Sequence, residues 1–111
     1  MCIRDREYAV AHLGVNLIVV LGHESCGAVT AALAGGDNGY NLNHLLSHIE
    51  PAKAASRNKS VNAVVKKNAK MTGKELVERS SILANAASKK NGLKIVPAYY
   101  NLGSGKVDFM K

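Results

Sequence analysis

The most informative stretch of this sequence runs Leu17-Ile18-Val19-Val20-Leu21-Gly22-His23-Glu24-Ser25-Cys26-Gly27. Its first five residues are apolar and rich in β-branched side chains. An unbroken apolar run of this kind is typical of a strand covered on both faces, as in parallel sheets with flanking helices. Gly22 ends the run. Residues 26–33 then follow a helical pattern, which the glycines at 35 and 36 end.

The segments on either side of this stretch predict an α/β protein. Upstream, residues 7–14 have the pattern of the end of an amphipathic helix, with Gly14 suited to its C-terminal cap. Downstream we expect helices over residues 42–49, around 61–65 and over 74–88. Asn41 is the candidate N-cap of the first, Pro51 ends or kinks it, and a break at Thr72-Gly73 precedes the last.

The C-terminal segment predicts a β-hairpin. Residues 93–100 are a strand candidate, residues 101–105 form a glycine-containing loop, and residues 106–110 alternate like a half-exposed return strand. Pro97 has no N–H to donate to a neighbouring strand and is therefore expected at a bulge or on an edge. The expected fold is α/β, with a mainly parallel β-sheet flanked by helices and a C-terminal antiparallel hairpin.

Composition narrows the classes of function. The 111 residues are enough for one domain, and two cysteines in unlike contexts do not indicate a disulfide framework. Residues 1–50 carry two Arg and five acidic residues, for a charge of −3, whereas residues 51–111 carry eleven Lys, two Arg and three acidic residues, for +10. The lysines are scattered over helical stretches without interleaved aromatics. We therefore expect solvated helix surfaces and no nucleic-acid partner.

Neither a membrane span nor a signal peptide is predicted. The longest apolar run, residues 17–21, has five residues, against the roughly 20 that a spanning helix needs. The charged N-terminal residues are not followed by a hydrophobic stretch. The expectation is a chain without membrane contact and with a cytoplasmic location.

His23 and Cys26 are the candidate metal ligands. His23 stands where a strand delivers its last side chain, at the carboxyl edge where open α/β sheets build their sites. Cys26 stands at the start of the next helix, where unpaired N–H groups and the helix dipole favour the thiolate that binds metal. Imidazole nitrogen and thiolate sulfur are a donor pair that Zn²⁺ accepts. Gly22 and Gly27 are expected to keep the neighbouring backbone free of side-chain bulk.

The spacing alone leaves other interpretations open. A strand-end histidine and a buried helix cysteine need not bind metal, and two ligands do not complete a tetrahedral site. Glu24 and Ser25 are expected to shape the turn or cap the helix rather than to act as an acid or a nucleophile. His12 is expected on a helix surface.

Two further pairs of residues have plain structural interpretations. His44 and His48 share a helix face, but Leu45 stands where a zinc protease has its glutamate, so both are expected at a surface or helix interface. Tyr99 and Tyr100 are expected to pack in the strand.

Longer motifs resemble the β-class carbonic anhydrases. In that family a helix with the sequence E-Y-A-V precedes an apolar strand that ends in G-H-x-x-C-G-A-V, and residues 7–10 and 13–29 of this chain are similar to both. Residues 93–107, L-K-I-V-P-A-Y-Y-N-L-G-S-G-K-V, resemble the closing hairpin of the family. Pro97 stands where glycine is usual. The resemblance covers about residues 7–111.

One block of the family pattern is missing. Family members carry an earlier C-x-D-x-R block that supplies a second cysteine ligand and an Asp–Arg pair beside the metal. Residues 2–6, Cys-Ile-Arg-Asp-Arg, mimic it, but the aspartate is one position late and the block lies too close to His23. We interpret residues 1–6 as a foreign or misjoined start, Cys2 as an ordinary thiol, and residues 7–111 as a partial β-carbonic anhydrase domain without its catalytic Asp–Arg pair.

The resemblance implies a function for the parent enzyme. It implies a Zn²⁺ cofactor held in part by His23 and Cys26, and reversible hydration of carbon dioxide to bicarbonate and a proton. It also implies a homodimer or a higher homo-oligomer, and little activity for this chain alone. The alternative is a non-catalytic carbonic anhydrase-like remnant that acts as an interaction module, and a basic nucleic-acid-binding module ranks third.

Overall fold

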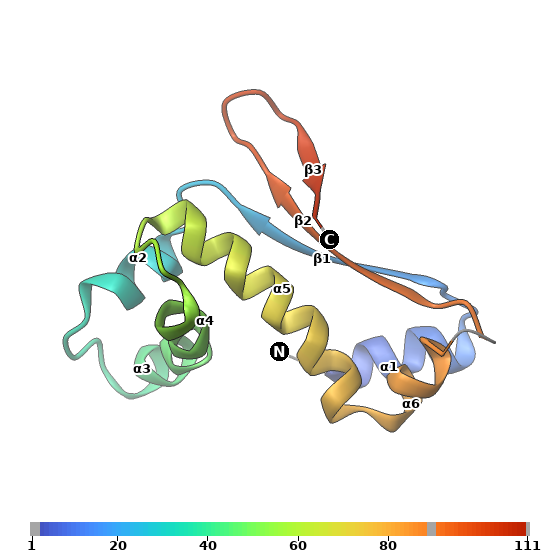
Figure 1. Ribbon diagram of the computed structural model, residues 1–111. Helices are drawn as coiled ribbons and strands as arrows, with labels where there is room; N and C mark the ends of the chain where they lie inside the picture. The colour runs from blue at the N-terminus through green and yellow to red at the C-terminus, as the bar shows by residue number, and fades with distance from the viewer. Residues whose placement is uncertain (1–2, 89–90, 111) are drawn as a thin grey trace.

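The computed structural model describes residues 3–88 and 91–110. Helices precede and follow the first strand, and two strands close the chain (Figure 1). In chain order the elements are α1 (Ile3–His12), β1 (Leu17–His23), α2 (Gly27–Ala34), α3 (Tyr40–Ser47), α4 (Glu50–Ala55), α5 (Val61–Arg79), α6 (Ser81–Ala86), β2 (Lys94–Tyr100) and β3 (Val107–Phe109).

The described strands form one sheet in the order β1-β2-β3. β1 and β2 are parallel, in a register that sets His23 beside Tyr100. β2 and β3 are antiparallel and form the predicted hairpin, with Tyr100 opposite Val107. The α/β class, the parallel pair and the closing hairpin are therefore confirmed.

Pro97 lies neither on an edge strand nor at a bulge, because β2 is the middle strand of the sheet. It pairs with Val20 of β1, and its carbonyl oxygen accepts a hydrogen bond from Met110 N at 2.8 Å, just past the end of β3. The carbonyl and the nitrogen of a strand residue face the same neighbour. The nitrogen of Pro97, which carries no proton, therefore faces the end of the short β3 strand. The hydrogen bonds between β2 and β1 do not need this nitrogen, so their pairing is unaffected.

Helix α5 crosses β1 and β2 on one face of the sheet, and the other helices lie on the same side (Figure 1). The predicted break at Thr72-Gly73 is wrong, since α5 is continuous from Val61 to Arg79. A Cβ added at Gly73 would lie 3.6 Å from Ile95 Cγ2 and 4.0 Å from Val20 Cγ2. The glycine thus stands where the helix approaches the strands, and packing outweighs its low helix propensity. The break falls instead at Ser80, whose side chain accepts a hydrogen bond from Leu83 N and caps α6.

Two groups of buried residues form the core. The first lies among α2, α3, α4, the first half of α5 and Tyr99. The second lies where α5, α6 and β2 meet, around Leu76, Leu83 and Leu93. The first group supports α2, the helix that Cys26 caps.

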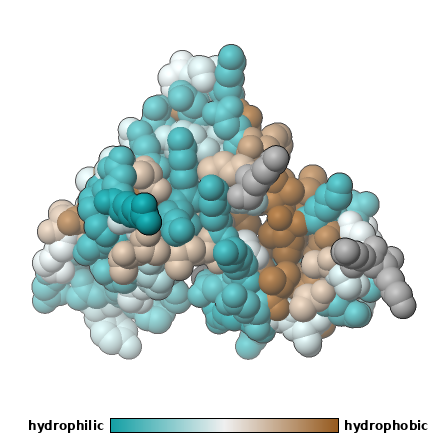
Figure 2. Space-filling view, viewed as in Figure 1, coloured by the Kyte–Doolittle hydropathy of each residue, from teal (hydrophilic) through white to brown (hydrophobic). Residues whose placement is uncertain are grey.

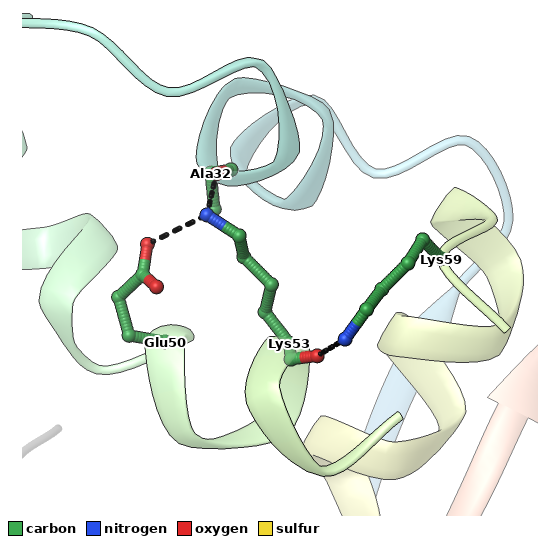
Figure 3. A network of polar contacts seen from close by, with 4 residues as sticks. All are labelled: Ala32, Glu50, Lys53 and Lys59. Carbon is green, nitrogen blue, oxygen red and sulfur yellow. Dashed lines mark hydrogen bonds and ion pairs between the residues drawn. The ribbon is translucent and has the colours of Figure 1, made fainter. Parts of the chain in front are cut away.

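A lysine fixes the far end of α2. Lys53 Nζ donates to the carbonyl oxygen of Ala32 at 3.1 Å and lies 3.3 Å from Glu50 Oε1 (Figure 3). Lys59 Nζ in turn donates to the carbonyl oxygen of Lys53. A cation at the carboxyl end of a helix stabilises the exposed carbonyl groups there. The network therefore joins α2 to α4 and to the segment before α5.

The face of β1 opposite α5 is exposed, so the prediction of a strand covered on both faces is wrong for this structure. Burial alternates along β1, with Leu17, Val19 and Leu21 being 50%, 41% and 53% exposed. The reason is that the helices in contact with the strands lie on one side. In Figure 2 the darkest brown, apolar atoms gather right of centre, and paler brown atoms are scattered elsewhere among teal and white ones.

Several smaller expectations change. α3 begins at Tyr40 with Gly39 as its N-cap, so Asn41 lies inside the helix. Pro51 lies in the first turn of α4 and not at the end of α3. α1 begins at Ile3 and ends at His12, ahead of the predicted cap at Gly14, which has φ of 71°. No helix in residues 3–88 and 91–110 has both the length and the apolar character needed to cross a bilayer.

Candidate metal centre

His23 is the last residue of β1, at the carboxyl end of the parallel pair. Glu24 N donates to the carbonyl oxygen of Tyr100 at 2.9 Å, which carries the pairing one residue further. The His23 ring is exposed, and its Nδ1 lies 3.1 Å from the carbonyl oxygen of Glu24. A carbonyl oxygen can only accept, so this bond requires the proton on Nδ1. The lone pair of Nε2 is thereby left for a metal ion.

Cys26 is the N-cap of α2 and a half-buried free thiol. Its backbone is extended, with φ of −62° and ψ of 119°, and its side chain makes no capping hydrogen bond. Its carbonyl oxygen accepts bonds from Thr30 N at 3.0 Å and from Thr30 Oγ1 at 2.9 Å. The backbone of Cys26 is therefore fixed by the first turn of α2, while its sulfur has no capping role.

The turn between the two donors is held from α5. Ser25 has a left-handed backbone with φ of 56°, an uncommon conformation for a residue other than glycine. Its amide N donates to Oδ1 of Asn62, 3.1 Å away in the first turn of α5. Sequence reasoning placed Ser25 in the turn but did not identify Asn62, because no local pattern joins residues 37 positions apart.

The two glycines of the motif differ in their surroundings. A Cβ added at Gly22 would lie 2.6 Å from Val65 Cγ1 and 3.4 Å from the Val65 carbonyl oxygen. Only glycine allows α5 to approach β1 this closely. A Cβ added at Gly27 would meet no heavy atom of the described residues within 4 Å. The structure therefore gives no steric reason for Gly27.

His23 and Cys26 line one cavity of about 550 Å³, between the end of β1, α2, α3 and α5. His44, His48 and Glu75 line the same cavity. Within the described parts of the chain, no group of three or more His, Cys, Asp or Glu side chains is placed to hold a metal ion. A free imidazole nitrogen and a free thiol suit Zn²⁺, so the donors fit that ion, but a tetrahedral centre needs more ligands than these two.

Tyr99 of β2 pairs with Gly22 of β1, close to Glu24 in the turn after His23. Glu24 is half-buried and Tyr99 is 5% exposed, with Lys66 Nζ 4.6 Å from the centre of its ring. Burial, and to a lesser extent the nearby charge of Glu24, raise the pKa of the Tyr99 hydroxyl. Tyr99 is therefore a core residue of β2, packed as expected, and Tyr100 is half-buried beside it.

The other candidate residues lie elsewhere or outside the described part. His12 is exposed on α1, and its ring lies 5.1 Å from that of Tyr8. His44 and His48 are exposed at the end of α3, as expected, with ring centres 5.1 Å apart. Cys2 lies outside the described residues. Residues 3–6 continue into α1 without a break, and the foreign origin of residues 1–6 stays a prediction.

A histidine at a strand end and a cysteine at the next helix start line one cavity at the edge of a parallel sheet. The fold is therefore α/β, and the two residues are a candidate pair of metal ligands. The family model described as carbonic anhydrase matches residues 2–107. Carbonic anhydrase 2 of Mycobacterium tuberculosis is 35% identical over 107 residues, with 90% of this chain and 51% of that protein covered. A carbonic anhydrase of Mycolicibacterium smegmatis is 32% identical over 109 residues, with 92% and 52% covered.

Solved structures agree with these relatives. A β-carbonic anhydrase of Coccomyxa superposes with a TM-score of 0.81 at 26% identity, covering 96% of this chain and 52% of that chain. The β-carbonic anhydrase CafA of Aspergillus fumigatus gives 0.80 at 28% identity, covering 95% and 53%. A tetrameric β-carbonic anhydrase of Sordaria macrospora gives 0.82 at 24% identity, covering 95% and 57%, and supports the fold alone.

The chain therefore belongs to the carbonic anhydrase family, and its fold is that of the β class. It spans about half the length of the curated relatives it matches.

Proposed function

We propose that this chain is part of a zinc-dependent enzyme for the reversible hydration of carbon dioxide to bicarbonate and a proton. His23 and Cys26 are two of its metal ligands. The observation that carries the proposal is the placement of both residues on one cavity, in a chain that matches the carbonic anhydrase family over residues 2–107.

The residues around the pair serve to orient it. Because Nδ1 of His23 donates to the Glu24 carbonyl oxygen, Nε2 has the free lone pair that would bind the ion. The hydrogen bond from Ser25 N to Asn62 sets the turn that separates the donors. Zn²⁺, when bound, supplies a Lewis acid that lowers the pKa of water toward neutrality.

The chain by itself is expected to be a poor enzyme. A zinc centre of this type needs three protein ligands and an open position, and the proposal takes only two ligands from this chain. We expect weak zinc binding and little or no carbon dioxide hydration by the 111-residue chain. Hydration within about tenfold of a longer relative would contradict this part of the proposal.

The gene upstream of Met1 tests the proposal itself. An in-frame C-x-D-x-R block ahead of this region supports the enzyme, and its absence supports a non-catalytic module instead. If the block is present, the longer product is expected to contain zinc and to hydrate carbon dioxide. Replacing either His23 by Ala or Cys26 by Ser is expected to abolish both properties, and full retention of both in either variant would overturn the assignment of these ligands.

Assembly and location are further parts of the proposal. The exposed apolar side chains of β1, with Phe109 of β3 at 68% exposure, support a homodimer or a higher homo-oligomer of the complete protein. The β-carbonic anhydrase of Sordaria macrospora, which has the same fold, is tetrameric. Sedimentation of the complete protein as a monomer at micromolar concentration would contradict the assembly. The cytoplasmic location stays a prediction, which cell fractionation tests.

A further inference from the structure

The cavity that contains His23 and Cys26 has a second pair of metal donors on another wall. His44 lies in the last turn of α3, and His48 is the C-cap of that helix, with φ of −71° and ψ of −18°. Both rings are exposed, and both line the cavity. Because His48 keeps a helical backbone, the two side chains lie one turn apart on the same helix face.

The separation of the two rings is compatible with chelation. Their centres are 5.1 Å apart and their planes are at 87°. An ion about 2.0–2.1 Å from one nitrogen of each ring, with a tetrahedral angle between the two bonds, leaves the ring centres roughly 5 Å apart. In the described part of the chain, neither ring takes part in a hydrogen bond. The nitrogens of both rings are therefore available without the loss of an existing bond.

We propose that His44 and His48 form a second binding site, outside the His23–Cys26 pair, for a divalent transition ion such as Zn²⁺, Ni²⁺ or Cu²⁺. Imidazole ligands select this class of ion over Mg²⁺ and Ca²⁺, which prefer oxygen. Two histidines at positions i and i+4 of a helix are a known way to present such ligands.

Solvent completes the coordination of the bound ion. No group of three or more candidate ligands is placed together in residues 3–88 and 91–110. Glu75 of α5 lines this cavity and, with His48, a neighbouring cavity of about 240 Å³. Its carboxylate offsets the positive charge of Arg79 on the same cavity wall. The site is therefore open and weaker than a closed structural zinc site.

The test is a zinc titration of the 111-residue chain by calorimetry. Cys2→Ser, His23→Ala and Cys26→Ser are combined as the background, so that His12 is the only histidine or cysteine left besides the proposed pair. We expect one ion per chain in this background. Loss of ligand-supporting groups at zinc sites costs about 10–100-fold in affinity, so the further change His44→Gln or His48→Gln is expected to weaken binding at least about tenfold.

His12→Gln is the matched control, because His12 is an exposed helical histidine outside the cavity. It is expected to leave the titration unchanged. Glutamine keeps helix propensity, and circular dichroism verifies that each variant is folded. Zinc binding that is unchanged by both His44→Gln and His48→Gln, or that is lost equally in His12→Gln, overturns the proposal.

A second measurement locates the ion. Substoichiometric Cu²⁺ is expected to broaden the ring resonances of His44 and His48 before those of His12, and broadening of His12 first would contradict the site. Because His23 and Cys26 are absent from this background, failure of either measurement leaves the proposed hydratase unaffected.

Discussion

The amide of Ser25 donates a hydrogen bond to Oδ1 of Asn62 at 3.1 Å, and this bond joins the turn between His23 and Cys26 to the first turn of α5. The turn contains a left-handed residue, so its conformation depends on such support. The position of the two donors is therefore set partly by a helix that contributes no ligand of its own.

Replacing Asn62 by Ala is expected to weaken metal binding by the His23–Cys26 pair more than it weakens the fold. The loss of one exposed hydrogen bond costs about 0.5–1.5 kcal/mol of unfolding free energy. Asn85→Ala on α6 is the control, because that side chain is exposed and distant from the cavity. Urea unfolding and Co²⁺ titration check the two effects. Equal Co²⁺ affinity in both variants would show that Asn62 does not position the donors.

Replacing Gly22 by Ala is expected to destabilise the protein by about 1–3 kcal/mol, because the new methyl group would overlap a buried valine. The Val65 side chain is 4% exposed and β-branched, and it cannot rotate away freely. Gly27→Ala is the matched change in the same motif, where the space is open. Since Gly27 begins α2, alanine there is expected to be neutral or stabilising, by up to about 1 kcal/mol. Similar urea midpoints for the two variants would contradict this account of the close approach.

Replacing Ser25 by Gly is expected to leave stability unchanged or to raise it slightly, since glycine adopts positive φ without steric cost. Ser25→Val is expected to be about 1–2 kcal/mol less stable than Ser25→Gly, because left-handed backbone brings a Cβ too close to the following carbonyl oxygen and a branched Cβ is tolerated worst there. Thermal unfolding of both variants checks the ranking. A valine variant as stable as the glycine variant would show that the turn is not left-handed in solution.

Tyr99 predicts a pH dependence of stability. Its pKa is raised in the folded chain, first by burial and then by Glu24, so the unfolded chain loses this proton at lower pH than the folded chain. The contribution of the neutral hydroxyl is therefore complete below about pH 10, the ordinary value, and is lost as the pH rises through the folded pKa. In urea unfolding, the stability of the unmodified chain relative to Tyr99→Phe is expected to be constant from pH 7 to about pH 9 and to fall above about pH 10. If the unmodified chain instead became more stable relative to Tyr99→Phe above this pH, the direction of the pKa shift would be contradicted.

The sequence predicted the elements whose signals are local. The apolar run of β1 and the hairpin of β2 and β3 follow from short local patterns, although β1 continues past Gly22 to His23. The candidate metal ligands could be proposed for the same reason, because His23 and Cys26 lie in one short motif, and their role stays a prediction.

The remaining features depend on contacts between distant segments. Gly73 was interpreted as a helix break, but it lies where α5 crosses the strands and packing keeps the helix intact. The exposed face of β1 could not be predicted from an unbroken apolar run, which indicates apolar neighbours without showing whether this chain supplies them. Asn62 was missed because a single polar residue at a helix start has no motif.

X-ray absorption at the zinc edge tests the central claim most directly, namely that His23 and Cys26 bind the same ion. The sample is the zinc-loaded chain with Cys2→Ser, His44→Gln and His48→Gln, so that His23 and Cys26 are the expected donors. We predict one sulfur at about 2.3 Å and one imidazole nitrogen at about 2.0–2.1 Å. We also predict that Cys26→Ser removes the sulfur and that His23→Ala removes the imidazole. A zinc spectrum without sulfur, or one in which the imidazole persists after His23→Ala, would contradict the account.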